Sequence, residues 1–206
     1  KRQPLFLTQM RLLQGVGVIP EFSEGVAEAG EILDELARLY SPNVPTDKTP
    51  AKQMAYALFN RVPVIYGVQG LTDAVALRWR SQIHENSKNW ATMAALSELD
   101  HNEITSWLSL SSITQQVVSL VFLEDREDGD LMFRRRQITW DAVSPHVAGA
   151  FTVQSQGESR LARLFSLVLL GDFVSCYLAV LNQVDPLPVP VIEELKQALS
   201  IGSSKA

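Results

Sequence analysis

The residues best suited to chemistry lie in one stretch, SQIHENSKNWATMAALSELDHNEITSW, which spans residues 81–107. Glu85 falls late in one amphipathic segment, and His101 opens the next one. A carboxylate and a titratable imidazole on the ends of neighbouring elements are groups that can move protons on a small polar substrate. The stretch therefore predicts acid–base chemistry, provided that the fold brings the two side chains together.

The residues around His101 suggest how it would be held. Asp100 and Glu103 have the spacing of a capping box, in which the N-cap residue and the third helical residue exchange hydrogen bonds with the backbone. His101 would then be the first helical residue, where the helix dipole disfavours a charged imidazole. A neutral imidazole can both accept and donate a proton. The same spacing also fits an ordinary helix start with a solvated histidine, and Glu85 alone also fits a solvated helix charge.

Composition narrows the class of protein. The chain has 206 residues, 46% of them hydrophobic and 20% charged, which is the profile of a soluble globular protein. Its net charge of -5, with one short basic cluster at 134–136, argues against nucleic acid as a partner. The single cysteine, Cys176, excludes an internal disulfide and fits a cytoplasmic protein. Cys176 is expected in the core, and we expect no membrane span, cofactor or metal.

The order of predicted elements indicates an α/β fold. Apolar and β-branched runs predict strands over 62–67, 91–96, 116–123 and 146–153. Helices are predicted over 5–14, 23–40, 50–60, 71–87, 134–144, 157–181 and 189–199. Strands that alternate with helices favour a parallel sheet with helices on both faces.

Ligands of such sheets bind beyond the carboxyl ends of the strands. That rule places the loops 67–71, 97–101 and 154–158 at the candidate rim, and two of them lead into the segments that carry Glu85 and His101. The loop 154–158 precedes a long helix, so its backbone N–H groups could bind an anion. An ordinary strand-to-helix connection is the other interpretation of that loop.

A resemblance to a known family sharpens these expectations. HENSK at 84–88, followed by LDHNEITSW at 99–107, resembles the ENxK and HNE pattern of the bacterial and archaeal bifunctional phosphoglucose/phosphomannose isomerases. The resemblance covers roughly residues 45–200 and includes NRVPVIYG at 60–67, RWRSQ at 78–82, SRLARLFSLVLLGDFVS at 159–175, VDPLP at 184–188 and IEELKQAL at 192–199. It implies a SIS (sugar isomerase) domain, a three-layer αβα sandwich with a mainly parallel sheet. One difference is His84, where the family usually has an asparagine-like residue.

The resemblance also implies roles for three residues. Glu85 matches the base that moves a proton between C1 and C2 of the sugar through a cis-enediol intermediate. His101 matches the residue that opens the sugar ring, and Lys196 looks like a C-terminal lysine that acts at the ring oxygen or the phosphate. The implied reaction interconverts glucose 6-phosphate, mannose 6-phosphate or both with fructose 6-phosphate.

The family pattern further implies partners. Its members have two SIS domains, and the first carries a Ser/Thr-rich loop that cradles the sugar phosphate; these 206 residues contain no such loop. We therefore interpret residues 1–44 as a helical lead or linker from an N-terminal SIS domain of the same protein, and 45–206 as the C-terminal SIS domain. Related phosphoglucose isomerases take the histidine from a neighbouring subunit, so a homodimer is expected. The alternative is a non-catalytic SIS module that binds a phosphosugar or serves in dimerisation, but such a module would not need a base at Glu85.

Overall fold

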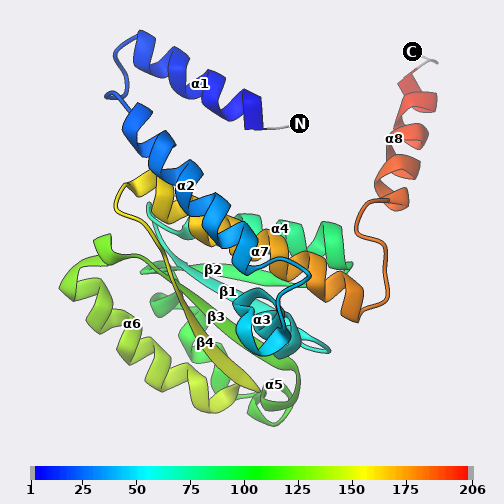
Figure 1. Cartoon of the computed structure of the whole chain (residues 1–206). Helices are drawn as coiled ribbons and strands as arrows, with labels where there is room; N and C mark the ends of the chain where they lie inside the picture. Colours follow the sequence, from blue (N-terminus) through cyan, green and yellow to red (C-terminus); the bar gives the residue numbers. More distant parts are fainter. Residues whose placement is uncertain (1–2, 204–206) are drawn as a thin grey trace.

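A single parallel sheet forms the centre of the protein. The computed structural model describes residues 3–203, and its four strands have the order β2-β1-β3-β4, with every neighbouring pair parallel (Figure 1). The strands are β1 (Val62–Val68), β2 (Thr92–Leu96), β3 (Val118–Glu124) and β4 (Gly149–Gln154). All four correspond to predicted strands, so the expected α/β class with a parallel sheet is confirmed.

Helices connect and cover the strands. They are α1 (Gln3–Gly15), α2 (Ser23–Leu39), α3 (Pro50–Leu58), α4 (Asp73–Ser87), α5 (Ser111–Val117), α6 (Gly129–Val143), α7 (Arg160–Leu181) and α8 (Pro190–Ser203). Sequence patterns predicted all of these except α5. The third strand was predicted to start at Gln116, which instead lies in the last turn of α5, so the strand begins two residues later.

Alternating side chains of the central strands supply two separate cores. Ile65, Val121 and Leu123 face a cluster built with α2, α3, α4 and α7. Tyr66 and Phe122 face the opposite cluster, which includes residues of α6 and of the segment after β2. Strands buried on both faces are apolar throughout, which is why β1 and β3 were recognisable as continuous runs. Two covered faces make the expected three-layer sandwich.

Helix α7 is the most apolar element of this sandwich. By length and composition it could cross a membrane, although no membrane span was expected from the sequence. In the structure it packs against α2, α3 and α4 and buries ten of its residues, Ala162, Arg163, Ser166, Leu167, Leu170, Gly171, Val174, Ser175, Leu178 and Ala179. This is the packing of a core helix. Cys176 lies on its exposed side, so the expectation of a core cysteine is wrong.

A buried ion pair fastens α7 to the carboxyl end of β3. The Arg163 Nε donates to both carboxylate oxygens of Asp125 at 3.1 and 3.0 Å, and both side chains are at most 3% exposed. Burial acts to raise the pKa of Asp125, but hydrogen bonds from the Glu127 N–H and the Ser155 hydroxyl, together with Arg163, outweigh it and leave the pKa below its usual range. The ionised carboxylate is therefore part of the fold.

Candidate functional site

The turn that carries Glu85 is held firmly in place. Helix α4 ends at Ser87, and Lys88 follows in the left-handed conformation (φ 55°), a common way to terminate a helix. The Asn86 amide donates to the Ser175 hydroxyl at 2.8 Å, and the Asn182 amide donates to the Ser87 carbonyl at 2.9 Å. The end of α4 is thus tied to the C-terminal half of α7.

His84 has a structural role in this turn. Its Nε2 lies 2.9 Å from the Ala91 carbonyl oxygen and 3.1 Å from the Ala91 nitrogen, and so bridges the end of α4 to the start of β2. Glu85 and Lys88 are exposed, and the Lys88 ammonium donates to the Glu85 backbone carbonyl at 2.5 Å. Across the described residues the Glu85 carboxylate has no hydrogen bond or ion pair. A rigid turn therefore presents a free carboxylate.

His101 lies in a different local structure from the one predicted. Two short 3₁₀ helices, Glu98–His101 and Glu103–Leu108, replace the expected α-helix. The Asp100 carboxylate accepts from the Arg135 guanidinium and the Thr139 hydroxyl instead of capping a helix. The predicted capping box is therefore wrong, because the Asp100 carboxylate binds side chains of α6. His101 ends its short helix with an exposed side chain.

Glu85 lies near the amino ends of the strands, and His101 lies at their carboxyl ends. Helix α4 starts beside the carboxyl end of β1 and runs back toward the amino ends of the strands, so Glu85, twelve residues after Asp73, lies about 18 Å along the helix from that edge. Strand β2 then runs back to the carboxyl ends of the strands, and His101 lies in the short helix that follows it there. The proviso that the fold brings the two side chains together is therefore not met within a single chain.

Lys196 is on the Glu85 side of the molecule. Helix α7 ends beside the end of α4, as the Asn182–Ser87 hydrogen bond shows, and α8 follows from there. In Figure 1, α8 extends away from the sandwich, and its residues 190–200 are exposed. The chain thus holds Glu85 on a fixed turn, Lys196 on a projecting helix and His101 at the far edge.

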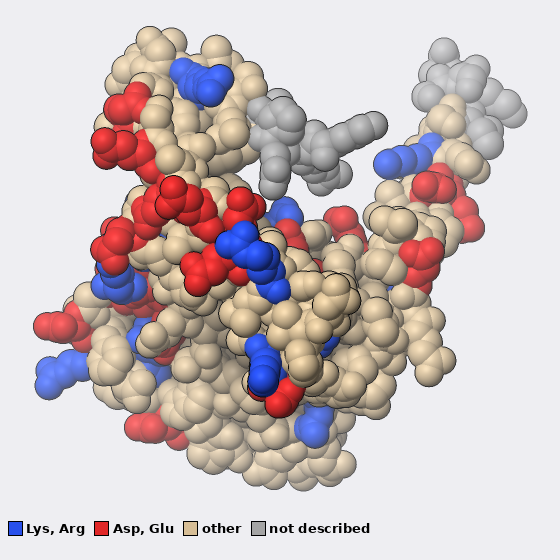
Figure 2. Space-filling model, in the orientation of Figure 1, with Lys and Arg blue, Asp and Glu red and all other residues tan. Residues whose placement is uncertain are grey.

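The loop 154–158 does bind an anion, but the anion belongs to the chain. Backbone N–H groups of Glu158 and Ser159 donate to the Glu28 carboxylate of α2, and these hydrogen bonds lower the pKa of Glu28. Figure 2 shows acidic side chains gathered along α2, which carries Glu24, Glu28, Glu31, Asp34 and Glu35. These two N–H groups, just before α7, are therefore occupied.

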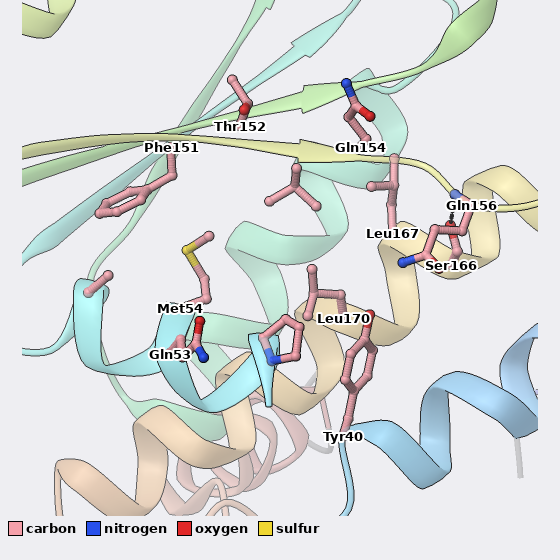
Figure 3. Close-up of a pocket in the computed structure, with 13 residues that line it drawn as sticks. Tyr40, Gln53, Met54, Phe151, Thr152, Gln154, Gln156, Ser166, Leu167 and Leu170 are labelled. Carbon is pink, nitrogen blue, oxygen red and sulfur yellow. Dashed lines mark hydrogen bonds between the residues drawn. The ribbon is translucent and has the colours of Figure 1, made fainter. Parts of the chain in front are cut away.

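A cavity of about 350 Å³ lies between β4, α3 and α7 (Figure 3). Met54, Phe151 and Leu170 supply apolar walls, and the Gln156 N–H donates to the Ser166 hydroxyl at 2.8 Å. Glu85, His101 and Lys196 do not line it. It is therefore separate from the candidate site.

Sequence reasoning missed a hydrogen-bonded group behind His101. The Tyr66 hydroxyl on β1 donates to the Glu103 carboxylate at 2.6 Å and accepts from the Trp107 indole N–H at 3.1 Å. Tyr66 is fully buried, and burial together with the Glu103 charge raises the pKa of its phenol far above the usual range. One signal was available, because a tyrosine inside a buried strand needs a partner for its hydroxyl.

Comparison with known proteins agrees with the fold and the motifs. A family model described as the bacterial phospho-glucose isomerase C-terminal SIS domain matches residues 47–199. The bifunctional phosphoglucose/phosphomannose isomerase of Caldicellulosiruptor bescii is 41% identical over 95% of this chain and 57% of its own length, and that of Aquifex aeolicus is 34% identical over 81% and 51%. A glucose-6-phosphate isomerase like protein from Thermus thermophilus has the same fold, with a TM-score of 0.67 at 23% identity over 90% of this chain and 59% of its own.

The match to these relatives is partial in one respect. The chain spans just over half the length of the two curated relatives, while the aligned regions cover most of this chain. The matched segment 47–199 contains both motif regions, the ENSK turn and the HNE segment. The chain therefore belongs to the bacterial phosphoglucose isomerase family, as its C-terminal SIS domain.

Proposed function

We propose that the chain is the C-terminal half of an aldose–ketose isomerase that interconverts glucose 6-phosphate, mannose 6-phosphate or both with fructose 6-phosphate. Family membership supports this reaction, since the relatives are named as phosphoglucose/phosphomannose isomerases. An N-terminal SIS domain of the same protein would hold the substrate phosphate. The single cysteine supports a cytoplasmic location.

In this proposal, Glu85 is the base. Its carboxylate removes the proton from C2 of the open-chain aldose, the electrons of that C–H bond form a C1=C2 double bond, and the C1 carbonyl oxygen takes up a proton to give the cis-enediol. The O2 hydroxyl then loses its proton as the carboxylate returns its own proton to C1, which gives the ketose. Rotation about the C2–C3 bond lets the same base serve both C2 epimers. An exposed carboxylate that pairs with no cation among residues 3–203 is suited to accept a proton. His101 transfers the proton that opens the ring, and Lys196 acts at the ring oxygen or the phosphate.

The observation that carries the proposal is the separation of Glu85 from His101 within one chain. A sugar held at Glu85 is out of reach of the same chain's His101, since the two lie at opposite sheet edges. In a twofold dimer, the end of each chain that carries His101 could pack against the end of the other chain that carries Glu85. This packing would complete two equivalent sites. We therefore propose a homodimer whose sites each use both subunits.

Mixed dimers test this arrangement in the full-length protein. Glu85→Gln should lower isomerisation by about 10²–10⁴, and His101→Ala should remove most of the activity on the cyclic sugar because ring opening is impaired. Co-expressed together, they should form hybrids with one intact site, and random pairing would restore about a quarter of the wild-type activity. A mixture of Glu85→Gln with Glu85→Ala is the matched control and should stay inactive.

Two results would overturn the proposal. If one chain supplied a whole site, the Glu85→Gln and His101→Ala mixture would remain inactive, because no hybrid would contain an intact site. A wild-type protein that is strictly monomeric by light scattering at micromolar concentration would also contradict it. A wild-type dimer that binds fructose 6-phosphate without turning it over would favour the non-catalytic SIS module.

A further inference from the structure

The segment around His101 is anchored on both sides of the histidine. On one side, Asp100 accepts from Arg135 at 3.0 Å and from the Thr139 hydroxyl at 2.8 Å, which fixes the segment to α6. On the other side, Glu103 accepts from the buried Tyr66 hydroxyl, which fixes it to β1. His101 is exposed between these two anchors, so its position depends on them.

The Tyr66 anchor is the more deeply buried of the two. Tyr66 is fully buried and Trp107 is 6% exposed, and the indole N–H completes the phenol's hydrogen bonds. Their rings lie in the core cluster formed by β1, β3 and α6, and Tyr66 packs edge-on against Phe122 with ring centroids 5.2 Å apart. The hydroxyl therefore has a fixed place from which to hold Glu103.

We propose that Tyr66 and Asp100 are positioning residues that hold His101 in the orientation in which it reaches the sugar bound at the other subunit. This inference rests on the proposed function. An apolar core could stabilise the segment, but only directional hydrogen bonds to residues on each side of His101 fix the geometry of the exposed imidazole. A histidine delivered across an interface needs such a rigid base, because within residues 3–203 the exposed His101 side chain has no hydrogen bond or ion pair of its own.

Tyr66→Phe tests the stronger anchor in the full-length protein. The change keeps the ring and removes the hydroxyl, which leaves Glu103 and the Trp107 N–H without their partner. We expect kcat to fall about 10- to 100-fold with KM nearly unchanged, because misplacement of a reacting group affects the chemical step. Tyr177→Phe is the matched control, since its hydroxyl donates to the Tyr40 carbonyl on the other face of the sheet; its kcat should equal that of the wild type.

Hybrid dimers separate positioning from general damage. When a Tyr66→Phe/Glu85→Gln chain is paired with a His101→Ala chain, the one working site takes its histidine from the chain that carries Tyr66→Phe. Its activity, relative to the parent hybrid, should therefore fall by the same factor as kcat of the Tyr66→Phe protein. When a Tyr66→Phe/His101→Ala chain is paired with a Glu85→Gln chain, the working histidine comes from the chain whose Tyr66 is intact. This hybrid should keep the activity of the parent hybrid. Equal loss in both placements would overturn the inference, as would no loss in either.

Two further measurements keep the outcomes distinct. The parent Glu85→Gln and His101→Ala hybrid tests the proposed function by itself, so its inactivity would refute that function and not the role of Tyr66 alone. If Tyr66→Phe does not fold, Asp100→Asn tests the second anchor, because it keeps an acceptor for Thr139 and loses the charge that faces Arg135. In hybrids, Asp100→Asn should lower activity only when it lies on the chain that supplies the working histidine. An equal loss on either chain would contradict the inference.

Discussion

Gly171 allows α7 to cross α4 at close range, and Gly171→Ala should therefore destabilise the protein. A Cβ at this position would lie 2.3 Å from the Trp79 Nε1 and 2.4 Å from its Cδ1. Trp79 is 1% exposed, and its Nε1 donates to the Leu167 carbonyl at 2.8 Å. The indole cannot move aside without losing that hydrogen bond, so the added methyl group must shift one helix or the other.

The size of the effect follows from three contributions. Overpacking costs about 1–3 kcal/mol, a buried donor left without its acceptor costs about 1–3 kcal/mol, and alanine in place of glycine in a helix returns about 1 kcal/mol. The free energy of unfolding should fall by about 3 kcal/mol, which lowers the melting temperature by about 6–12 °C. Urea unfolding followed by circular dichroism measures the first quantity, and thermal unfolding followed by the same signal measures the second.

Gly30→Ala in α2 is the matched control, because no atom lies within 4 Å of its added Cβ. It should raise the free energy of unfolding by about 0.5–1 kcal/mol. The two variants make the same chemical change in a helix, so their opposite signs isolate the helix crossing. A Gly171→Ala protein as stable as the wild type would refute the reasoning.

Two further predictions concern the base and the buried ion pair. Glu85→Gln in the full-length protein should lower the rates of glucose 6-phosphate and mannose 6-phosphate isomerisation together, by about 10²–10⁴; survival of one activity in a coupled assay would contradict a single base. Asp125→Asn should lower the free energy of unfolding at pH 7 by about 3 kcal/mol, because it leaves the buried Arg163 with the half-exposed Glu127 as its remaining charge partner. Since the folded-state pKa of Asp125 is lowered, its contribution is present above the unfolded pKa of about 3.9 and is lost as the pH falls through the folded value. The difference between the two proteins in urea unfolding should therefore shrink toward pH 3, and an equal difference at both pH values would argue against this account.

The sheet was predictable because its strands carry their own signal. β1 and β3 are apolar on both faces, and this continuous pattern fixed their positions within two residues. The short helix α5 was not predictable, since it is only seven residues long and ends in a valine that reads as strand. Helix α7 was recognised as a helix, but its exposed side, where Cys176 lies, is apolar enough to resemble the buried side.

The candidate site was predictable in its residue types and not in its geometry. The loops that lead into the segments of Glu85 and His101 were both placed at the carboxyl ends of the strands, yet a helix that follows a parallel strand must run back to their amino ends. That rule could have placed Glu85 correctly from the predicted elements alone. The pairing of Tyr66 with Glu103 links residues 37 positions apart and depends on the exact register of two elements, which no local pattern encodes.

The Glu28 carboxylate at the start of α7 has a consequence for where phosphate can bind. A sugar phosphate that approached this helix start would have to displace a carboxylate already hydrogen-bonded to two N–H groups, and it would meet the other acids of α2. Like charges repel, so Glu28 would compete with any phosphate group for these two N–H groups. In the proposed enzyme, this arrangement favours phosphate binding away from the start of α7, in agreement with a phosphate held by the N-terminal domain.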